Sequence, residues 1–376
     1  MPGDGLGGER RMGILDDEGA AMSHGRVSVL MPVLNEEQHI RQAMASALAQ
    51  ESVEVELLVI DGRSRDATRE IVREVAGQDP RVKLLDNPLT KIPAALNVGL
   101  AHATGEYIAR LDAHATVNAD YLARGVAHLQ EDPTLGTVGG LRIGVSDCPT
   151  GRAVALALGS RLGVGNSINH YAKEFQYTDH ASFAVTRTHV AREVGGWDES
   201  ILVAEDVDFD CRILAAGYRI AFEPAMHILW HVRRSPRELT RQYRRYGRGK
   251  AATVRKNGPS SMRWRYLAPP ALVIGGTALL AMSPLKRTSM VGLLPYAAVI
   301  SYASSQAWRR RPAGEDVSAL SLPLAFMGMH VGWGVGFLEG MVLKRPPALA
   351  SGSSATIDDS ETTEKAAVES SPGMGG

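Results

Sequence analysis

Short apolar runs alternate with helical patterns over the first third of the chain. β-Branched and aliphatic residues fill the runs at 27–33, 55–60, 82–85 and 106–111, and each of the first three is followed by apolar residues at helical spacing. Because the connections are short, this alternation predicts a parallel sheet covered by helices on both faces. Ligands of such sheets bind at the carboxyl ends of the strands, so we expect functional side chains along one edge.

The pattern between 146 and 250 is less regular but still mixes helices and strands. It predicts helices at 153–162, 206–216 and 236–250, and strands at 182–186, 218–222 and 226–230. Together with the first third, these elements predict one α/β domain with a mixed sheet over residues 25–255.

After Tyr266 the composition becomes apolar. Three runs follow in which Glu339 is the only charged residue, at 267–283, 290–307 and 319–343. A bilayer core needs about 20 apolar residues. We therefore expect a membrane region with three transmembrane helices over 266–345, and the alternative is a helical subdomain buried within the protein.

The basic residues beside these runs predict their orientation. Lysine and arginine gather before the first run and at 309–311. Because cytoplasmic loops carry an excess of positive charge, we expect a multi-pass protein of the plasma membrane with the 25–255 domain in the cytoplasm.

Composition and charge constrain the chain further. Among its 376 residues, 41 Lys plus Arg balance 41 Asp plus Glu, so the net charge indicates no polyanionic partner. Cys148 and Cys211 lack metal-ligand spacing, which disfavours a disulfide framework and suits a reducing compartment. Residues 1–24, without a secretory apolar run, are expected to be a disordered leader, and 346–376 a disordered acidic tail.

Positive charge is concentrated in the helix expected at 236–250. One interpretation is an interfacial helix on anionic headgroups. The other is that Arg244, Arg245 or Arg248 binds a diphosphate or the pyrophosphate of a lipid-linked substrate, and the two interpretations are compatible. Nucleic acid is a poor third candidate because no aromatic ladder accompanies the charge.

A possible metal site follows the fourth apolar run. Asp112 and His114 lie one residue apart in an extended turn, so their side chains point to the same side. A carboxylate and an imidazole suit Mn²⁺ or, less well, Mg²⁺. An acid–x–His triplet alone is a weak signal that favours a structural turn, and its position at the end of a parallel strand strengthens the case for a metal.

A second acidic group opens the helix expected at 206–216. Glu205, Asp206 and Asp208 stand within four residues of one another. Carboxylates at a helix N-terminus are favoured by the helix dipole, which accounts for one acid more easily than for three. Crowded carboxylates raise one another's pKa, which suits a general base for a sugar hydroxyl.

A third group of polar residues lies at the ends of the first two strands. Glu36 and Asp61 can accept hydrogen bonds from a nucleobase or a ribose. The chain has no G-x-G-x-x-G and no Walker A sequence, which disfavours dinucleotide and ATP sites.

These motifs together resemble the family 2 glycosyltransferases of the GT-A fold. Residues 29–36, VLMPVLNE, resemble the family's opening strand and loop, and 59–68, VIDGRSRDAT, its second strand and loop. Asp112-Ala113-His114 stands at the DxD metal motif and 204–209, AEDVDF, at the ED base motif. The apolar runs and 163–167, GVGNS, look most like the ExoA-type transferases of exopolysaccharide assembly.

The resemblance implies roles for individual residues. Pro32, Leu34 and Glu36 would line the nucleoside pocket, Asp61 would meet the base, and Lys91 and Asn97 would lie near the ribose or diphosphate. Asp112 and His114 would hold the metal and diphosphate, although His114 replaces the family's second acid. Asp206 would deprotonate the acceptor, with Glu205 helping to place it.

The implied function is inverting transfer from a nucleoside-diphosphate sugar to a polyprenyl-linked saccharide, with membrane lipids as a further partner. The alternatives are a polyprenyl-phosphate glycosyltransferase, a non-catalytic membrane scaffold, and a pump or channel. Gln242-Tyr243-Arg244-Arg245-Tyr246 only partly matches the Q-x-x-R-W motif, so processive synthesis is not supported.

Overall fold

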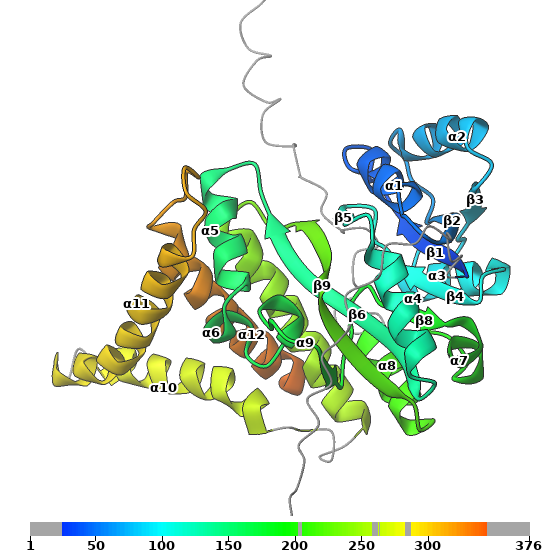
Figure 1. Ribbon diagram of the computed structural model, residues 1–376. Helices are drawn as coiled ribbons and strands as arrows, with labels where there is room; N and C mark the ends of the chain where they lie inside the picture. Colours follow the sequence, from blue (N-terminus) through cyan, green and yellow to red (C-terminus); the bar gives the residue numbers. More distant parts are fainter. Residues whose placement is uncertain (1–24, 202–204, 258–261, 263, 283–286, 344–376) are drawn as a thin grey trace, which may run out of the picture.

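The computed structural model describes residues 25–201, 205–257, 262, 264–282 and 287–343 (Figure 1). The leader and the acidic tail expected from the sequence lie outside these residues. The described part comprises a nine-stranded mixed sheet with helices on both faces, and a group of long helices at one side of the sheet (Figure 1).

The first third of the chain forms four parallel strands, as the sequence predicts, and their order in the sheet is β3-β2-β1-β4. The elements are β1 (Arg26–Val33), α1 (Ile40–Leu48), β2 (Glu54–Asp61), α2 (Thr68–Gln78), β3 (Val82–Asp86), α3 (Ile92–His102) and β4 (Tyr107–Arg110). Their carboxyl ends meet at one edge, which brings the residues after β1, β2 and β4 together.

Five further strands extend the sheet beyond β4. They follow the order β8-β6-β9-β5, and β7 pairs with β9. The strand β8 is antiparallel to both β4 and β6, whereas β6 and β9 are parallel. Their bounds are β5 (Ala115–Val117), β6 (Leu135–Val145), β7 (Gln176–Thr178), β8 (Val185–Arg187) and β9 (Arg219–His231).

The two strands expected at 218–222 and 226–230 are one strand, β9. Its pairing with β6 shifts between Glu223 and His227, which face the consecutive residues Gly140 and Leu141. Pro224 lies in this irregularity and cannot donate to the ladder. The proline therefore marks a bulge within one strand and not the end of a strand.

The helices between and after these strands complete the domain. They are α4 (Tyr121–Glu131), α5 (Pro149–Leu158), α6 (Arg161–Val164), η1 (Ile168–His170), α7 (Thr188–Glu193), α8 (Glu205–Ala215) and α9 (Pro236–Asn257). The helix expected at 153–162 is divided between α5 and α6. The first of these begins earlier than expected, at Pro149, a residue suited to a first helical turn. The basic helix α9 is longer than the expected 236–250.

Two apolar cores lie on opposite faces of the sheet. In β1, Val29 and Met31 belong to the core that also contains α1 and α4. Leu30, between them, belongs to the core covered by α3 and α8. This alternation follows the two-residue period of a strand, and it confirms that helices cover both faces.

The apolar runs after Tyr266 form shorter helices than expected. They comprise η3 (Trp264–Leu267), α10 (Ala268–Met282), η4 (Arg287–Leu293), α11 (Leu294–Arg309) and α12 (Ser321–Val342). In the described residues α12 alone has the length and composition to cross a membrane, and 56% of its apolar window is buried within the protein. Three transmembrane helices are therefore not confirmed.

The helices α9 and α12 pack unusually closely. Gly328, Gly332, Gly336 and Gly340 recur every four residues on the α12 face that meets α9. A Cβ atom built on Gly332 would lie 2.6 Å from the Thr240 carbonyl oxygen. Such small-residue stripes let helix backbones approach closely.

Candidate active site

The centre of the site is Arg110, the last residue of β4. Its Nε donates to Asp112 Oδ1 at 2.9 Å. Its NH1 donates to Asp206 Oδ1 at 2.6 Å and to Glu205 Oε1 at 3.1 Å. Asp112, after β4, and Asp206, in the first turn of α8, therefore share one guanidinium, as expected if both acids face the same cleft.

Burial and charge set the protonation of this cluster. Burial opposes the charge of Arg110, but Asp112, Asp206 and Glu205 hold the pKa of its guanidinium well above the usual value. The pKa of Asp112 is lowered, because Arg110 and the nearby His114 outweigh the effect of burial. The pKa of Glu205 is raised by burial and by Asp206, against the effect of Arg110. Asp112 is thus kept ionised and Glu205 takes up a proton readily.

Asp112 and His114 could hold a metal only with help from a ligand. His114 Nδ1 lies 3.2 Å from Glu36 Oε1, and both side chains are largely buried. A carboxylate on one ring nitrogen orients an imidazole so that its other nitrogen can bind a metal. The described residues contain no group of three or more metal-binding side chains. The pair therefore suits a metal whose remaining ligands are diphosphate oxygens.

Burial disfavours the charged form of His114, but the hydrogen bond to Glu36 and the charges of Glu36 and Asp112 raise its pKa overall. A proton and a metal would therefore compete for this imidazole.

The loops after β1 and β2 form a rigid edge beside this cluster. The Asp61 side chain is fully buried, and its carboxylate accepts from Arg69 NH1 at 2.6 Å and from Arg63 N at 3.0 Å. Asn35 N donates to Ser64 Oγ at 2.9 Å, which ties one loop to the other. Pro32 and Leu34 are partly exposed on the same edge.

Comparison with known proteins identifies the family. The sequence signature described as glycosyl transferase family 2 matches residues 28–192. Over 316 residues, which are 82% of this chain and 93% of the relative, the chain is 33% identical to the succinoglycan biosynthesis protein ExoA of Rhizobium meliloti. This chain is a family 2 glycosyltransferase.

The transferase is also similar to a second curated relative and to a solved structure. It is 24% identical, over 64% of its length and 77% of the relative, to dolichyl N-acetyl-alpha-D-glucosaminyl phosphate 3-beta-D-2,3-diacetamido-2,3-dideoxy-beta-D-glucuronosyltransferase of Methanococcus voltae. The solved mannosyltransferase PcManGT from Pyrobaculum calidifontis, in complex with GDP-Man and Mn²⁺, has a TM-score of 0.59 and 21% identity, covering 88% of this chain and 91% of that one. The likeness confirms the expected mixed α/β fold of the GT-A type.

Lys91 and Asn97 of the transferase differ in their surroundings. Lys91 is exposed just before α3. Asn97 lies within α3, where its Nδ2 donates to the Trp197 carbonyl at 2.8 Å and its Oδ1 accepts from Trp197 N at 2.8 Å. The amide of Asn97 thus joins α3 to the loop before α8, and the expected contact of both residues with the sugar nucleotide stays a prediction.

The three arginines singled out on α9 lie on two sides of the helix. Arg244 and Arg248, one turn apart, both pair with Glu339 of α12. Arg245 lies near Arg233, whose pKa is lowered by burial and by the charge of Arg245. Of the three, Arg245 is therefore the one that lies near Arg233.

Three functional candidates escaped the sequence analysis. Arg110 looks like an ordinary strand residue, and only the sheet shows that it joins the two acid groups. His180 Nδ1 lies 2.6 Å from Oδ2 of Asp210, one helical turn after Asp206, and this spacing was the one available signal. Arg142, on β6, has no sequence signal at all.

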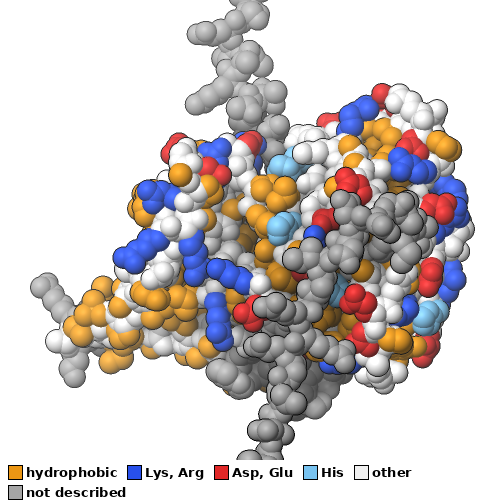
Figure 2. All heavy atoms as spheres, viewed as in Figure 1, with side chains coloured by type: hydrophobic (Ala, Val, Ile, Leu, Met, Phe, Trp, Pro, Cys, Tyr) orange, Lys and Arg blue, Asp and Glu red, His pale blue; other side chains and the backbone are white. Residues whose placement is uncertain are grey.

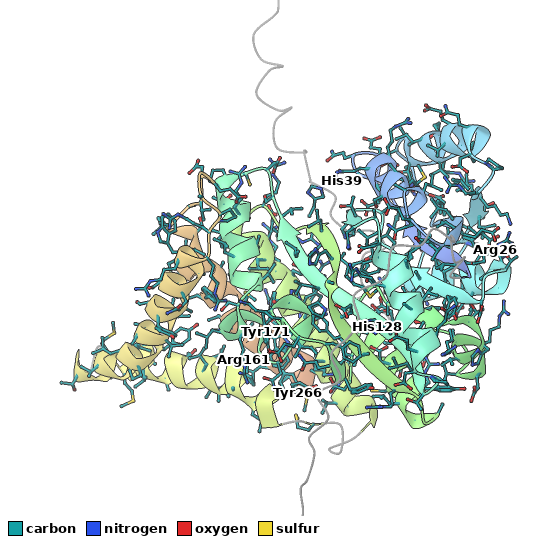
Figure 3. All side chains as sticks on the ribbon, in the orientation of Figure 1. Arg26, His39, His128, Arg161, Tyr171 and Tyr266 are labelled. Atoms are coloured by element: carbon teal, nitrogen blue, oxygen red, sulfur yellow. The ribbon has the colours of Figure 1, made fainter. Side chains whose placement is uncertain are left out.

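Two histidines lie beside the metal-binding candidates. His39, labelled in Figure 3, lies just before α1. Its ring stacks on that of His231 at the end of β9, with ring centroids 4.5 Å apart. His231 N donates to the His114 carbonyl at 3.4 Å, which links the end of β9 to the turn after β4. The two rings thus join the helix after β1 to the last strand beside the site.

Proposed function

We propose that the transferase moves a sugar, with inversion, from a nucleoside-diphosphate sugar to a hydroxyl of a lipid-linked saccharide in cell-surface polysaccharide assembly. The observation that carries this proposal is the junction of Asp112 and Asp206 through Arg110. It sets a diphosphate-binding acid and a candidate base close enough to act on one sugar.

In this reaction the acceptor oxygen forms a bond to the anomeric carbon while the bond from that carbon to the diphosphate oxygen breaks. Asp206 accepts the proton of the acceptor hydroxyl, and Glu205 helps to place the acceptor. Arg110 holds both carboxylates in position. A Mn²⁺ or Mg²⁺ ion bound by Asp112, His114 and the diphosphate would supply neutralisation of the leaving group's charge.

The donor's nucleoside is assigned to the edge formed by the loops after β1 and β2. Pro32, Leu34 and Asp61 lie there, and Asp61 is held by Arg69 and backbone amides. Such a rigid edge binds its ligand with little loss of conformational entropy. Glu36 takes part indirectly, since it orients His114.

We also propose that the transferase is bound to a membrane. Apolar side chains cover the arm formed by α10 and α11 (Figure 2), where Ile274, Leu294 and Tyr302 are each about 60% exposed. Exposed apolar patches of this kind mark contact with lipid or protein. We assign the arm and α12 to the membrane, with the α/β domain on the cytoplasmic side and the lipid-linked acceptor reaching the site beside α9.

The arginines of α9 would have separate tasks in this arrangement. Arg245, near Arg233, is the candidate for the diphosphate or the lipid-linked pyrophosphate. Arg244 and Arg248 would reach lipid phosphate only at the cost of their pairs with Glu339.

The test is a screen of nucleoside-diphosphate sugars with purified protein in detergent, a bacterial lipid extract and Mn²⁺ or Mg²⁺. We expect one donor to release nucleoside diphosphate and to label a lipid, only when metal is present. Release without any labelled lipid-linked product, with every donor, would contradict the proposed acceptor. If no donor binds and none releases nucleoside diphosphate, the proposed transfer reaction itself is contradicted.

A further inference from the structure

Arg142 is a partly buried cation with one buried N–H donor that is unpaired. It lies on β6, next to the shift in the pairing of β6 with β9. Its Nε is buried and has no hydrogen-bond partner. Within the described residues, the structure records no hydrogen bond or ion pair for the Arg142 side chain. An arginine has five N–H donors and stays charged in proteins, so leaving them unmatched is costly.

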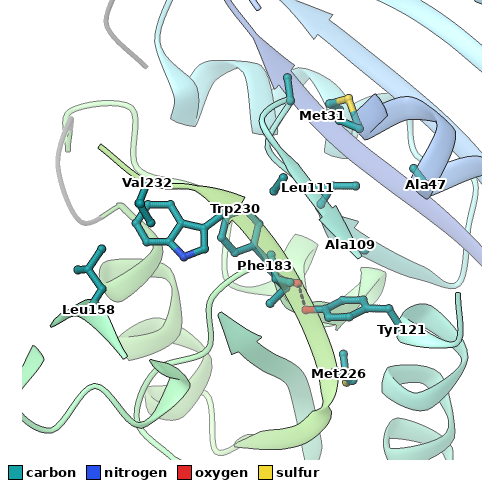
Figure 4. Close-up of a cluster of buried hydrophobic side chains, with 14 of the residues drawn as sticks. Met31, Ala47, Ala109, Leu111, Tyr121, Leu158, Phe183, Met226, Trp230 and Val232 are labelled. Atoms are coloured by element: carbon teal, nitrogen blue, oxygen red, sulfur yellow. Dashed lines mark hydrogen bonds between the residues drawn. The ribbon is translucent and has the colours of Figure 1, made fainter. Parts of the chain in front are cut away.

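Two aromatic rings hold the guanidinium in place. The Arg142 Cζ atom lies 4.4 Å from the centroid of the Trp230 ring and 5.3 Å from that of Phe183. Figure 4 shows Trp230 and Phe183 beside the end of β4, where Leu111 leads to Asp112. Contact with ring faces fixes the plane of a guanidinium and leaves its N–H edge available to a ligand.

Trp230 has an unused donor of its own. Its Nε1 is buried and, like Arg142 Nε, lacks a hydrogen-bond partner. Two orphaned donors in contacting side chains point to a missing acceptor group, because buried donors in native proteins are almost always paired.

The site beside Arg142 is the reaction centre. The charge of Arg142 contributes to the lowered pKa of Asp112, after the larger effects of burial, Arg110 and His114. Burial lowers the pKa of Arg142, and the charges of Asp112 and Asp206 partly oppose this effect. Arg142 is therefore close enough to feel the charge of both the acid assigned to the diphosphate and the acid assigned to the acceptor.

We propose that Arg142, with the Trp230 indole N–H, binds a phosphate oxygen at the reaction centre. This inference rests on the proposed function, which supplies two sources of phosphate: the diphosphate of the donor and the phosphate of a lipid-linked acceptor. The planar edge of an arginine matches phosphate oxygens in pairs, which a lysine cannot do.

The experiment measures binding to Arg142→Gln and Arg142→Lys in detergent. The probes are UDP and GDP with Mn²⁺, by calorimetry, and polyprenyl monophosphate and polyprenyl diphosphate as inhibitors of transfer. We expect Arg142→Gln to weaken one class of probe by about 10- to 100-fold, the loss typical of a charged hydrogen-bonding partner. Arg142→Lys should recover part of that loss.

The pattern of loss identifies the source of the phosphate. Weaker UDP or GDP binding with unchanged polyprenyl-phosphate inhibition assigns Arg142 to the donor, and the reverse assigns it to the acceptor. Unchanged affinity for every probe, in a variant that melts like the wild type, overturns the inference. If Arg142→Gln does not fold, Arg142→Lys is measured in its place. Wild-type affinity of Arg142→Lys for every probe would then overturn the inference.

Two controls keep the test specific. Trp230→Phe retains the aromatic ring and deletes the donor, and should weaken the same probe by a smaller factor, about 2- to 10-fold. Arg219→Gln removes another arginine that packs on a ring, that of Tyr177, at the opposite end of β9, and should change no probe. A wild-type protein that binds no nucleoside diphosphate at all would instead remove the proposed function.

Discussion

Two clusters of arginines and carboxylates in this molecule have opposite composition. At the end of β4, one arginine, Arg110, lies among three acids, so the cluster carries excess negative charge. Between α9 and α12, one acid, Glu339, lies between Arg244 and Arg248. The first cluster can accept a further cation, whereas the second has its only acid fully engaged by two cations.

The two clusters also lie in different surroundings, one at a sheet edge and the other between two helices. Arg110 joins elements from the sheet and from α8 at the edge where ligands bind. Glu339 lies on α12 in the same helix turn as Gly336 and Gly340, where the backbones of α9 and α12 approach. The second cluster docks one helix on another, and the first is the one that we propose for chemistry.

The largest predicted effect on donor binding follows from removing an acid of the first cluster. Asp112→Ala deletes both a metal ligand and a partner of Arg110, so metal-dependent binding of the donor nucleotide should weaken by about 100-fold or more. Calorimetry with and without Mn²⁺ measures the change. Asp120→Ala, which removes an exposed acid paired with Arg124, is the control and should bind the donor like the wild type. Equal metal-dependent affinity in both variants would contradict the role of Asp112.

A buried carboxylate without excess negative charge should affect stability alone. Glu56 of β2 accepts from Lys83 Nζ at 2.7 Å, Ser28 Oγ at 2.6 Å and Thr104 N at 3.1 Å. Burial raises its pKa, but these bonds prevail and lower it from 4.5 to about 2. This lowering of the pKa corresponds to roughly 3 kcal/mol of stability, which is present above pH 4.5 and lost as the pH falls toward 2.

Glu56→Gln should therefore lower the free energy of unfolding at pH 7 and flatten its decline between pH 4.5 and pH 2. Urea unfolding of the two proteins at several pH values measures this effect. Curves that stay parallel through that pH window would show that Glu56 makes no such contribution.

Adding a side chain to the glycine stripe should separate α9 from α12. The Cβ of a residue replacing Gly336 would overlap the Arg244 carbonyl oxygen. We expect Gly336→Val to lower the free energy of unfolding by about 1–3 kcal/mol, measured by thermal melting in detergent, while donor binding persists. The control is Gly275→Val in α10, where no heavy atom lies within 4 Å of the added Cβ. Similar melting of the two variants would contradict close docking.

The smallest effect concerns the charge of the second cluster. Glu339→Gln leaves Arg244 and Arg248 without their acid, and should cost about 1 kcal/mol of stability because the pair is partly exposed. Donor binding should not change. Glu74→Gln, which breaks an exposed pair with Arg41 on the outer helices, serves as the reference. A loss of donor binding in Glu339→Gln would show that the second cluster takes part in the reaction and does not only dock α12 on α9.

The parts of the molecule that the sequence predicts well are those determined by local pattern. The strands β1 to β4 and the edge at Asp61 and Asp112 follow from alternating apolar runs and the rule for parallel sheets. The junction of Asp112 with Asp206 follows from the same rule and from the family resemblance. Arg110 and Arg142 were missed, because an arginine in a strand has no pattern that separates a solvent-exposed residue from one that faces a site.

In the region after Tyr266, the sequence pattern determines the structure less fully, for another reason. Apolar composition is the same in a helix that faces lipid and in one that packs on protein. In α12 the glycine spacing and Glu339 mark the one face that meets α9. The shorter helices α10 and α11 begin after 3-10 turns that consume part of each apolar run.

The central claim is that Asp206 is the base for a sugar hydroxyl beside the diphosphate site of Asp112. The most direct measurement is of turnover and donor affinity in the same Asp206→Asn protein. The amide keeps the shape of the side chain and cannot take the proton, so turnover should fall by about 10²- to 10⁴-fold while the donor Kd stays close to the wild-type value. Turnover equal to that of the wild type would contradict the account.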